Sequence, residues 1–225
     1  RRQRQMCIRD RFQDYVTVDQ KDAFDYLSVY FNVKDDNHPP VHFMLLHTMS
    51  SVFRGTLSPW LGCSINLVCL GITLWLLLRL GRQLADVFSL EGKGRQLGIL
   101  AVLLYGMSTG ALGTVLLIRM YGLLSCLCVA LFSVHVEKWK NNGFDKKNKG
   151  LIAIKLLGFL TQYFFLFYCL LLAAVTAVIL LYRHRNKELW CYIRSMVIAA
   201  VIGLVLFLFA ISDVFSSGRG TEALG

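Results

Sequence analysis

Residues 97–136 read LGILAVLLYGMSTGALGTVLLIRMYGLLSCLCVALFSVHV, and this run decides the fold class. It holds 40 residues, and Arg119 is the only one that is Asp, Glu, Lys or Arg. As a single helix it would be about 60 Å long, twice the ~30 Å thickness of a bilayer core. We therefore expect a hairpin of two membrane helices whose apex lies near residues 108–113.

Three more apolar blocks flank this run, at residues 57–80, 150–182 and 189–212. Each exceeds the roughly 20 residues that a membrane helix needs. Block 150–182 allows only about 16 residues per arm as a hairpin, so its apex at Thr161, Gln162 and Tyr163 should stop below the outer surface. The blocks lack the alternation of barrel strands, so they should be helices. We predict an all-α, polytopic transmembrane helix bundle over residues 57–212, with about six membrane helices.

The positive charge gathers in the loops between the blocks. Thirteen of the 24 Lys and Arg lie in three short segments: Arg79, Arg82, Lys93 and Arg95; Lys138, Lys140, Lys146, Lys147 and Lys149; and Arg183, Arg185, Lys187 and Arg194. Such loops face the cytoplasm by the positive-inside rule, which explains the net charge of +10 without a nucleic-acid partner. Segments 12–56 and 213–225 should then be extracytoplasmic loops, on a chain that spans the plasma membrane several times.

Residues 1–11, RRQRQMCIRDR, have neither an apolar period nor the hydrophobic core of a signal peptide. They resemble translated sequencing-adapter sequence, so we interpret them as a non-native scar. The seven cysteines form no CxxC pair, and six of them lie in or beside apolar blocks, so we expect small buried hydrophobic side chains rather than a redox or zinc motif. GxGxxG, P-loop and GxSxG patterns are absent from the sequence.

The most informative outer stretch is DDNHPPVHFMLLH, residues 35–47. Pro39 and Pro40 suit the first turn of a helix. One reading is an amphipathic helix on the outer membrane surface, with an apolar side made of Val41, Phe43, Met44, Leu45, Leu46, Met49, Val52 and Phe53. The other is a cluster of carboxylates and histidines at the membrane boundary. His38 and His42 are four residues apart, which leaves a metal site open.

This stretch, DxHPPxxxxLLH, resembles the GT-C superfamily of polytopic glycosyltransferases, and in particular bacterial family-39 and Rgt-like proteins, relatives of the protein O-mannosyltransferases. Three later segments resemble the same family in order: IRMYGL at 118–123, LTQYF at 160–164 with Gln162 where His is usual, and FSSGRG at 215–220. The match to the family as a whole spans about residues 24–222.

The resemblance implies an inverting hexosyltransferase that moves a sugar from a polyprenyl-phosphate carrier to a glycan, lipid or protein acceptor outside the cytoplasm. It implies Asp36 and Asp35 as candidate catalytic acids. The residues expected to bind substrate are His38, Arg119, Tyr121, Gln162, Tyr163 and Arg219. No cofactor is implied, and a divalent metal is left open.

Arg119 should lie about five residues inside a membrane helix, where it either clamps the carrier phosphate or reaches a backbone carbonyl or the surface. Lys155 should extend its amine to the cytoplasmic surface and serve only structure.

The family's first membrane helix and principal acidic motif should precede residue 12, so we expect this chain to be a truncated fragment that is inactive alone. A transporter or flippase, or a non-catalytic scaffold, is the alternative to an enzyme.

Overall fold

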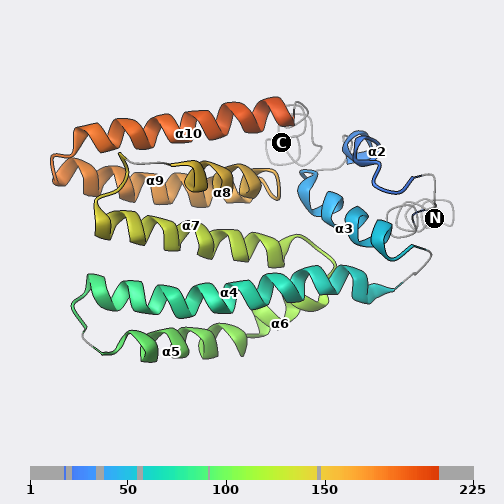
Figure 1. The fold of residues 1–225 in the computed structure, drawn as a ribbon, viewed down its shortest axis with the longest axis horizontal. Coiled ribbons are helices and arrows are strands. Elements are labelled where there is room, and N and C mark those ends of the chain that lie inside the picture. The colour runs from blue at the N-terminus through green and yellow to red at the C-terminus, as the bar shows by residue number, and fades with distance from the viewer. Residues whose placement is uncertain are drawn as a thin grey trace, which may run out of the picture.

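The computed structural model describes residues 18, 22–33, 38–54, 58–90, 92–145 and 148–207, and these contain helices and no strand. The all-α class is therefore confirmed. The helices are α2 (Tyr26–Asn32), α3 (Val41–Val52), α4 (Pro59–Val87), α5 (Gly94–Gly106), α6 (Thr109–Leu116), α7 (Tyr121–Asn141), α8 (Lys149–Phe159), α9 (Phe164–Tyr182) and α10 (Asn186–Leu206). In Figure 1, α4, α5 and α7 to α10 lie along one long axis, α6 is tilted away from it, and α2 and α3 cover the end where α4 begins.

Four helices, α4, α7, α9 and α10, are long and apolar enough to cross a membrane. The pair α5 and α6, bent by 60°, makes a fifth if it is counted as one span. The count of six is thus not confirmed. The reason is α8, whose 11 residues would extend only about 16 Å. The described chain is a membrane-spanning bundle of four or five such helices.

The first hairpin turns at a different place from the one predicted. Ser108 is the N-cap of α6 and does not lie at the turn of the hairpin. Its side chain accepts a hydrogen bond from the N–H of Ala111 at 3.1 Å, and the helix continues to Leu116. The chain reverses at residues 117–120, between α6 and α7. The apex predicted near 108–113 was wrong because the Ser-Thr-Gly sequence caps a second helix after a bend instead of forming a turn.

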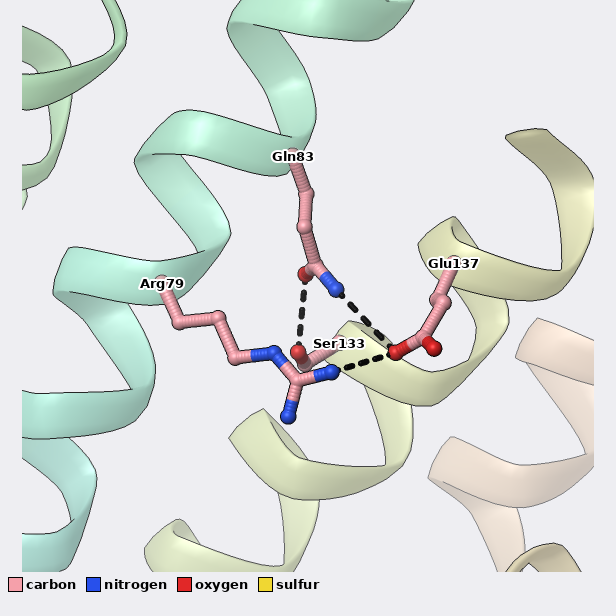
Figure 2. A network of polar contacts seen from close by, with 4 residues as sticks. All are labelled: Arg79, Gln83, Ser133 and Glu137. Carbon is pink, nitrogen blue, oxygen red and sulfur yellow. Dashed lines mark hydrogen bonds and ion pairs between the residues drawn. The ribbon is translucent and has the colours of Figure 1, made fainter. Parts of the chain in front are cut away.

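α4 is the central helix of one half of the bundle and packs against α5 and α7. At Gly81 the backbones of α4 and α5 come so close that an added Cβ would lie 2.2 Å from the backbone nitrogen of Gly98. Towards the basic end, Figure 2 shows a polar link between α4 and α7. Arg79 contacts Glu137 at 2.5 Å, while Gln83 contacts both Ser133 and Glu137 at 2.8 and 3.5 Å.

In the other half, α8 packs against α7, α9 and α10. The core of this half contains the fully buried side chains of Leu131, Phe144, Leu151 and Tyr192. Phe144 precedes α8, and its burial shows that the connection from α7 to α8 enters the bundle before α8 begins. Figure 1 accordingly shows α8 alongside only part of α9. Block 150–182 was predicted to form a hairpin with two short arms. Only the first arm, α8, is short, because the second arm, α9, has 19 residues.

The six cysteines in the described ranges are free thiols, and the burial expected for them holds for three. Cys69, Cys126 and Cys169 are buried between helices. Cys63, near the start of α4, and Cys191, near the start of α10, are half-buried.

Candidate functional site

The end of the bundle opposite the basic loops joins two segments that are far apart in the sequence. His38 Nδ1 lies 3.3 Å from Gln162 Oε1, and the Val41 N–H donates to the Leu160 carbonyl at 3.1 Å. The start of α3 therefore rests on the apex between α8 and α9. We call these four residues, His38, Val41, Leu160 and Gln162, the outer junction.

The local sequence explains why the junction forms. Pro40 is the N-cap of α3 and has no side chain able to bind the first N–H groups of the helix. A helix start leaves those N–H groups unsatisfied, and the Leu160 carbonyl takes one of them. Thr161 and Gln162 are buried at 0% and 3% exposure, so the polar apex is enclosed and depends on protein partners.

Apolar packing below the junction holds it in place. Val29 and Val33, from α2 and its end, pack with Leu160 and with Phe207 at the end of α10. Tyr163 lies beside this cluster, half-buried, with its ring centre 5.9 Å from that of Phe159. Segments from both ends of the described chain thus converge on the apex of the second hairpin.

The buried face of α3, the helix predicted to lie on the membrane surface, is polar. Its buried residues are His42, His47, Ser50 and Ser51. Leu45, Val52 and Phe53, which belong to the apolar side predicted for this helix, are exposed. Polar side chains of α3 contact α2 and the segment before it, since Tyr26 lies against Thr48 and His47 and the Phe24 N–H donates to Ser51. Val41, Phe43 and Met44 pack beside the apolar cluster below the junction.

His42 is the most confined titratable group of this helix. It is 2% exposed, and neither ring nitrogen has a hydrogen-bond partner among the described residues. Burial, with a smaller contribution from His38, lowers the pKa of His42 from 6.5 to about 4. The ring is therefore neutral at pH 7.

Arg119 lies in the reversal between α6 and α7, not within a helix as predicted, and its residue is exposed. The prediction was wrong because the chain reverses at residues 117–120 instead of 108–113, which brings Arg119 to the apex. Asn66 fixes this turn from α4. Its fully buried side-chain amide donates to the carbonyls of Leu117 and Arg119 at 2.6 and 3.1 Å. Tyr121 follows as the first residue of α7 and is half-buried.

The structure thus brings His38 and Gln162 into contact and places Arg119 and Tyr121 at the same end of the bundle (Figure 1). Asp35, Asp36 and Arg219 lie outside the described residues. No group of three metal-binding side chains occurs within the described ranges, so His38 and His42 gain no third ligand there.

Sequence reasoning missed Asn66 and misjudged Lys155. Asn66 could have been found as an amide in the middle of an apolar block. The Lys155 amine does not reach the surface: it is buried without a hydrogen-bond partner in the described part of the chain and lies 4.2 Å from the ring centre of Tyr192. Tyr192 in turn contacts His135 at 3.0 Å. The bend of the chain before α8 moves Lys155 away from the bundle end, which explains the difference.

No family model, curated protein or solved structure matches the chain.

Replacing Asn66 should loosen the turn that carries Arg119. Asn66→Leu removes both hydrogen bonds to the turn carbonyls, and we expect a loss of about 1–2 kcal/mol in the free energy of unfolding. Thermal unfolding in detergent micelles measures this. Val68→Leu, at an exposed position of the same helix, is the control and should leave the transition unchanged. Equal stability of the Asn66 variant and the parent would contradict the anchoring role.

Proposed function

We propose that this chain is part of a membrane glycosyltransferase of the GT-C type, which transfers a sugar from a polyprenyl-phosphate carrier to an acceptor on the extracytoplasmic side. The observation that carries the proposal is the outer junction. The histidine of the HPP motif contacts Gln162 of the LTQYF motif, although 124 positions separate them in the sequence. Two of the four motifs that resemble the family therefore meet at one place.

The position of the junction suits such a reaction. A polyprenyl carrier stays in the bilayer while its phosphate and sugar reach the aqueous boundary, so the reacting groups must lie at the end of the bundle. Arg119, exposed at that end, offers a planar guanidinium that can bind a phosphate through two hydrogen bonds. Tyr121, two residues further along, adds a hydroxyl that can bind phosphate or sugar.

In the proposed step, the acceptor hydroxyl oxygen forms a bond to the anomeric carbon of the sugar. The bond between that carbon and the phosphate oxygen breaks, and its electron pair leaves with the polyprenyl phosphate. The acceptor proton passes to a carboxylate, for which Asp36 is the first candidate and Asp35 the second. Attack from the face opposite the phosphate inverts the anomeric configuration. Arg119 would stabilise the negative charge that grows on the leaving phosphate.

The test is transfer of radiolabelled sugar from polyprenyl-phosphate donors, using protein expressed from the gene's own start codon and reconstituted in vesicles. We expect Asp36→Asn to reduce the rate by about 100-fold or more, since a general base contributes that much. Arg119→Lys keeps the charge but loses the planar fork, and we expect about a tenfold loss at least. His38→Ala and Gln162→Ala should each impair transfer by opening the junction.

Lys187→Gln, at an exposed site on α10 at the opposite end, is the control and should transfer sugar normally. A transporter would move the carrier or its sugar across the membrane without forming a glycosidic bond, and a scaffold would do neither. No transfer from any polyprenyl-phosphate sugar, or full activity of the Asp36 and Arg119 variants, would reject the proposal.

A further inference from the structure

The basic end of the bundle contains an open pocket of about 740 Å³ between α4, α5 and α7. Its charged lining residues are Arg82, Asp86, Arg95 and Lys140. Lys140 is already paired with Asp86 at 2.7 Å. Arg82 and Arg95 make no hydrogen bond or ion pair with any described residue, so two guanidinium groups at the pocket are unpaired within the described part of the chain, where Asp86 is already paired with Lys140. Glu91, in the same loop, lies outside the described residues.

The start of α5 adds to the positive potential of this pocket. Gly94 and Arg95 line it, and Lys93, the N-cap, makes no side-chain hydrogen bond to the helix. Within α5, the first backbone N–H with a partner among the described residues is that of Leu97, which donates to the Lys93 carbonyl. The N–H groups of Gly94 and Arg95 therefore stay available, and the positive end of the helix dipole favours an anion.

A second hollow, of about 370 Å³, continues from the pocket along the surface of α4. It is lined by Trp75, Leu78, Arg79 and Arg82, so Arg82 belongs to both hollows. These residues follow each other at helical spacing and form a single stripe. Arg79 is neutralised by Glu137 (Figure 2), and Trp75 is 58% exposed on a helix long enough to span the membrane. The groove is thus apolar towards the bilayer centre and cationic at the bundle end.

We propose that the pocket and this groove together bind one anionic phospholipid. Its headgroup phosphate lies between Arg82 and Arg95 at the start of α5, and one acyl chain lies along Leu78 and Trp75. This arrangement fits a lipid better than a soluble anion, because the cationic pocket adjoins an apolar groove on the bilayer-facing surface. Basic pockets between membrane helices on this side bind anionic headgroups in other proteins. This site is at the opposite end from the outer junction and is independent of the proposed sugar transfer.

Fluorescence quenching of Trp75 by brominated lipids tests the proposal directly. Trp60, Trp139 and Trp190 are replaced by Phe, and the full chain is reconstituted in phosphatidylcholine bilayers. Brominated phosphatidylglycerol or brominated phosphatidylcholine is then added at equal mole fraction, to both leaflets. We expect the anionic lipid to quench Trp75 with an apparent affinity on the order of tenfold higher, since two cations near a headgroup contribute that much. Equal quenching by the two lipids would overturn the proposal without any further variant.

Charge variants distinguish a built site from a general surface potential. Arg82→Gln with Arg95→Gln should abolish the preference for the anionic lipid. Arg183→Gln with Lys187→Gln removes two exposed charges from the basic end outside the pocket and should preserve it. If both double variants lost the preference for the anionic lipid equally, the attraction would come from the general surface charge, and the proposed site would be rejected. Inorganic phosphate, added against sodium chloride at matched ionic strength, should not remove the preference; if it does, the pocket binds free phosphate and the lipid assignment is wrong.

Discussion

Gly81→Ala is expected to destabilise the bundle by about 3 kcal/mol, because the new methyl group has no space. It would lie 2.2 Å from the backbone nitrogen and 2.4 Å from the Cα of Gly98. These are backbone atoms of α5, which cannot rotate away as a side chain would, so the two helices must separate. Small residues allow membrane helices to approach this closely, and their packing is a main source of association in lipid.

Gly71→Ala provides a matched control on the same helix. An added Cβ at Gly71 would meet no atom within 4 Å, so only helix propensity changes, and alanine should be neutral or stabilising by up to about 1 kcal/mol. Thermal unfolding in micelles, followed by circular dichroism, should show a lower midpoint for the Gly81 variant and an unchanged or higher one for the Gly71 variant. Parallel behaviour of the two variants would show that α4 and α5 are not in backbone contact.

Acidification should weaken the outer helices through His42. The pKa of this ring is about 4 in the folded protein and about 6.5 when it is exposed. Between these values the unfolded chain binds more protons, so stability is complete above pH 6.5 and falls as the pH drops towards 4. A difference of this size corresponds to about 3 kcal/mol. The effect should appear as earlier proteolysis or unfolding of α3 at pH 5 than at pH 7.

His42→Leu should remove most of this pH dependence. It should also be at least as stable as the parent at pH 7, because neither ring nitrogen of His42 has a hydrogen-bond partner in the described structure. His184→Asn changes an exposed histidine in the turn before α10, where a positive φ of 53° also suits asparagine. This variant should retain the full acid sensitivity. An unaltered pH profile in the His42 variant would exclude His42 as the cause.

The membrane character of the fold could be predicted because it depends on composition and length alone. The apolar blocks became helices, since a backbone in lipid has no other way to bond its amides. The positions of the breaks could not be predicted in the same way. A serine such as Ser108 is common both in turns and at helix N-caps. It is an N-cap here because α6 packs against α4. The same ambiguity misplaced Arg119 by moving the reversal to residues 117–120.

The candidate site was predictable only as a set of motifs. The pattern indicated that residues 38 and 162 belong to one region, and the contact between His38 and Gln162 agrees with this. Their proposed roles in binding sugar or phosphate stay predictions. The burial of Lys155 and the anchoring by Asn66 depend on neighbours more than 35 positions away, which no local pattern contains.

The native cysteines have a practical consequence for deciding which end of the bundle faces the cytoplasm. Cys63 and Cys191 are half-buried and lie near the starts of two spans that run in opposite directions, so one thiol is close to each end (Figure 1). The chain therefore contains its own pair of orientation markers. Reagents that cannot cross a bilayer can separate the two sides of the membrane without any engineered reporter, which leaves the outer junction and the basic pocket undisturbed.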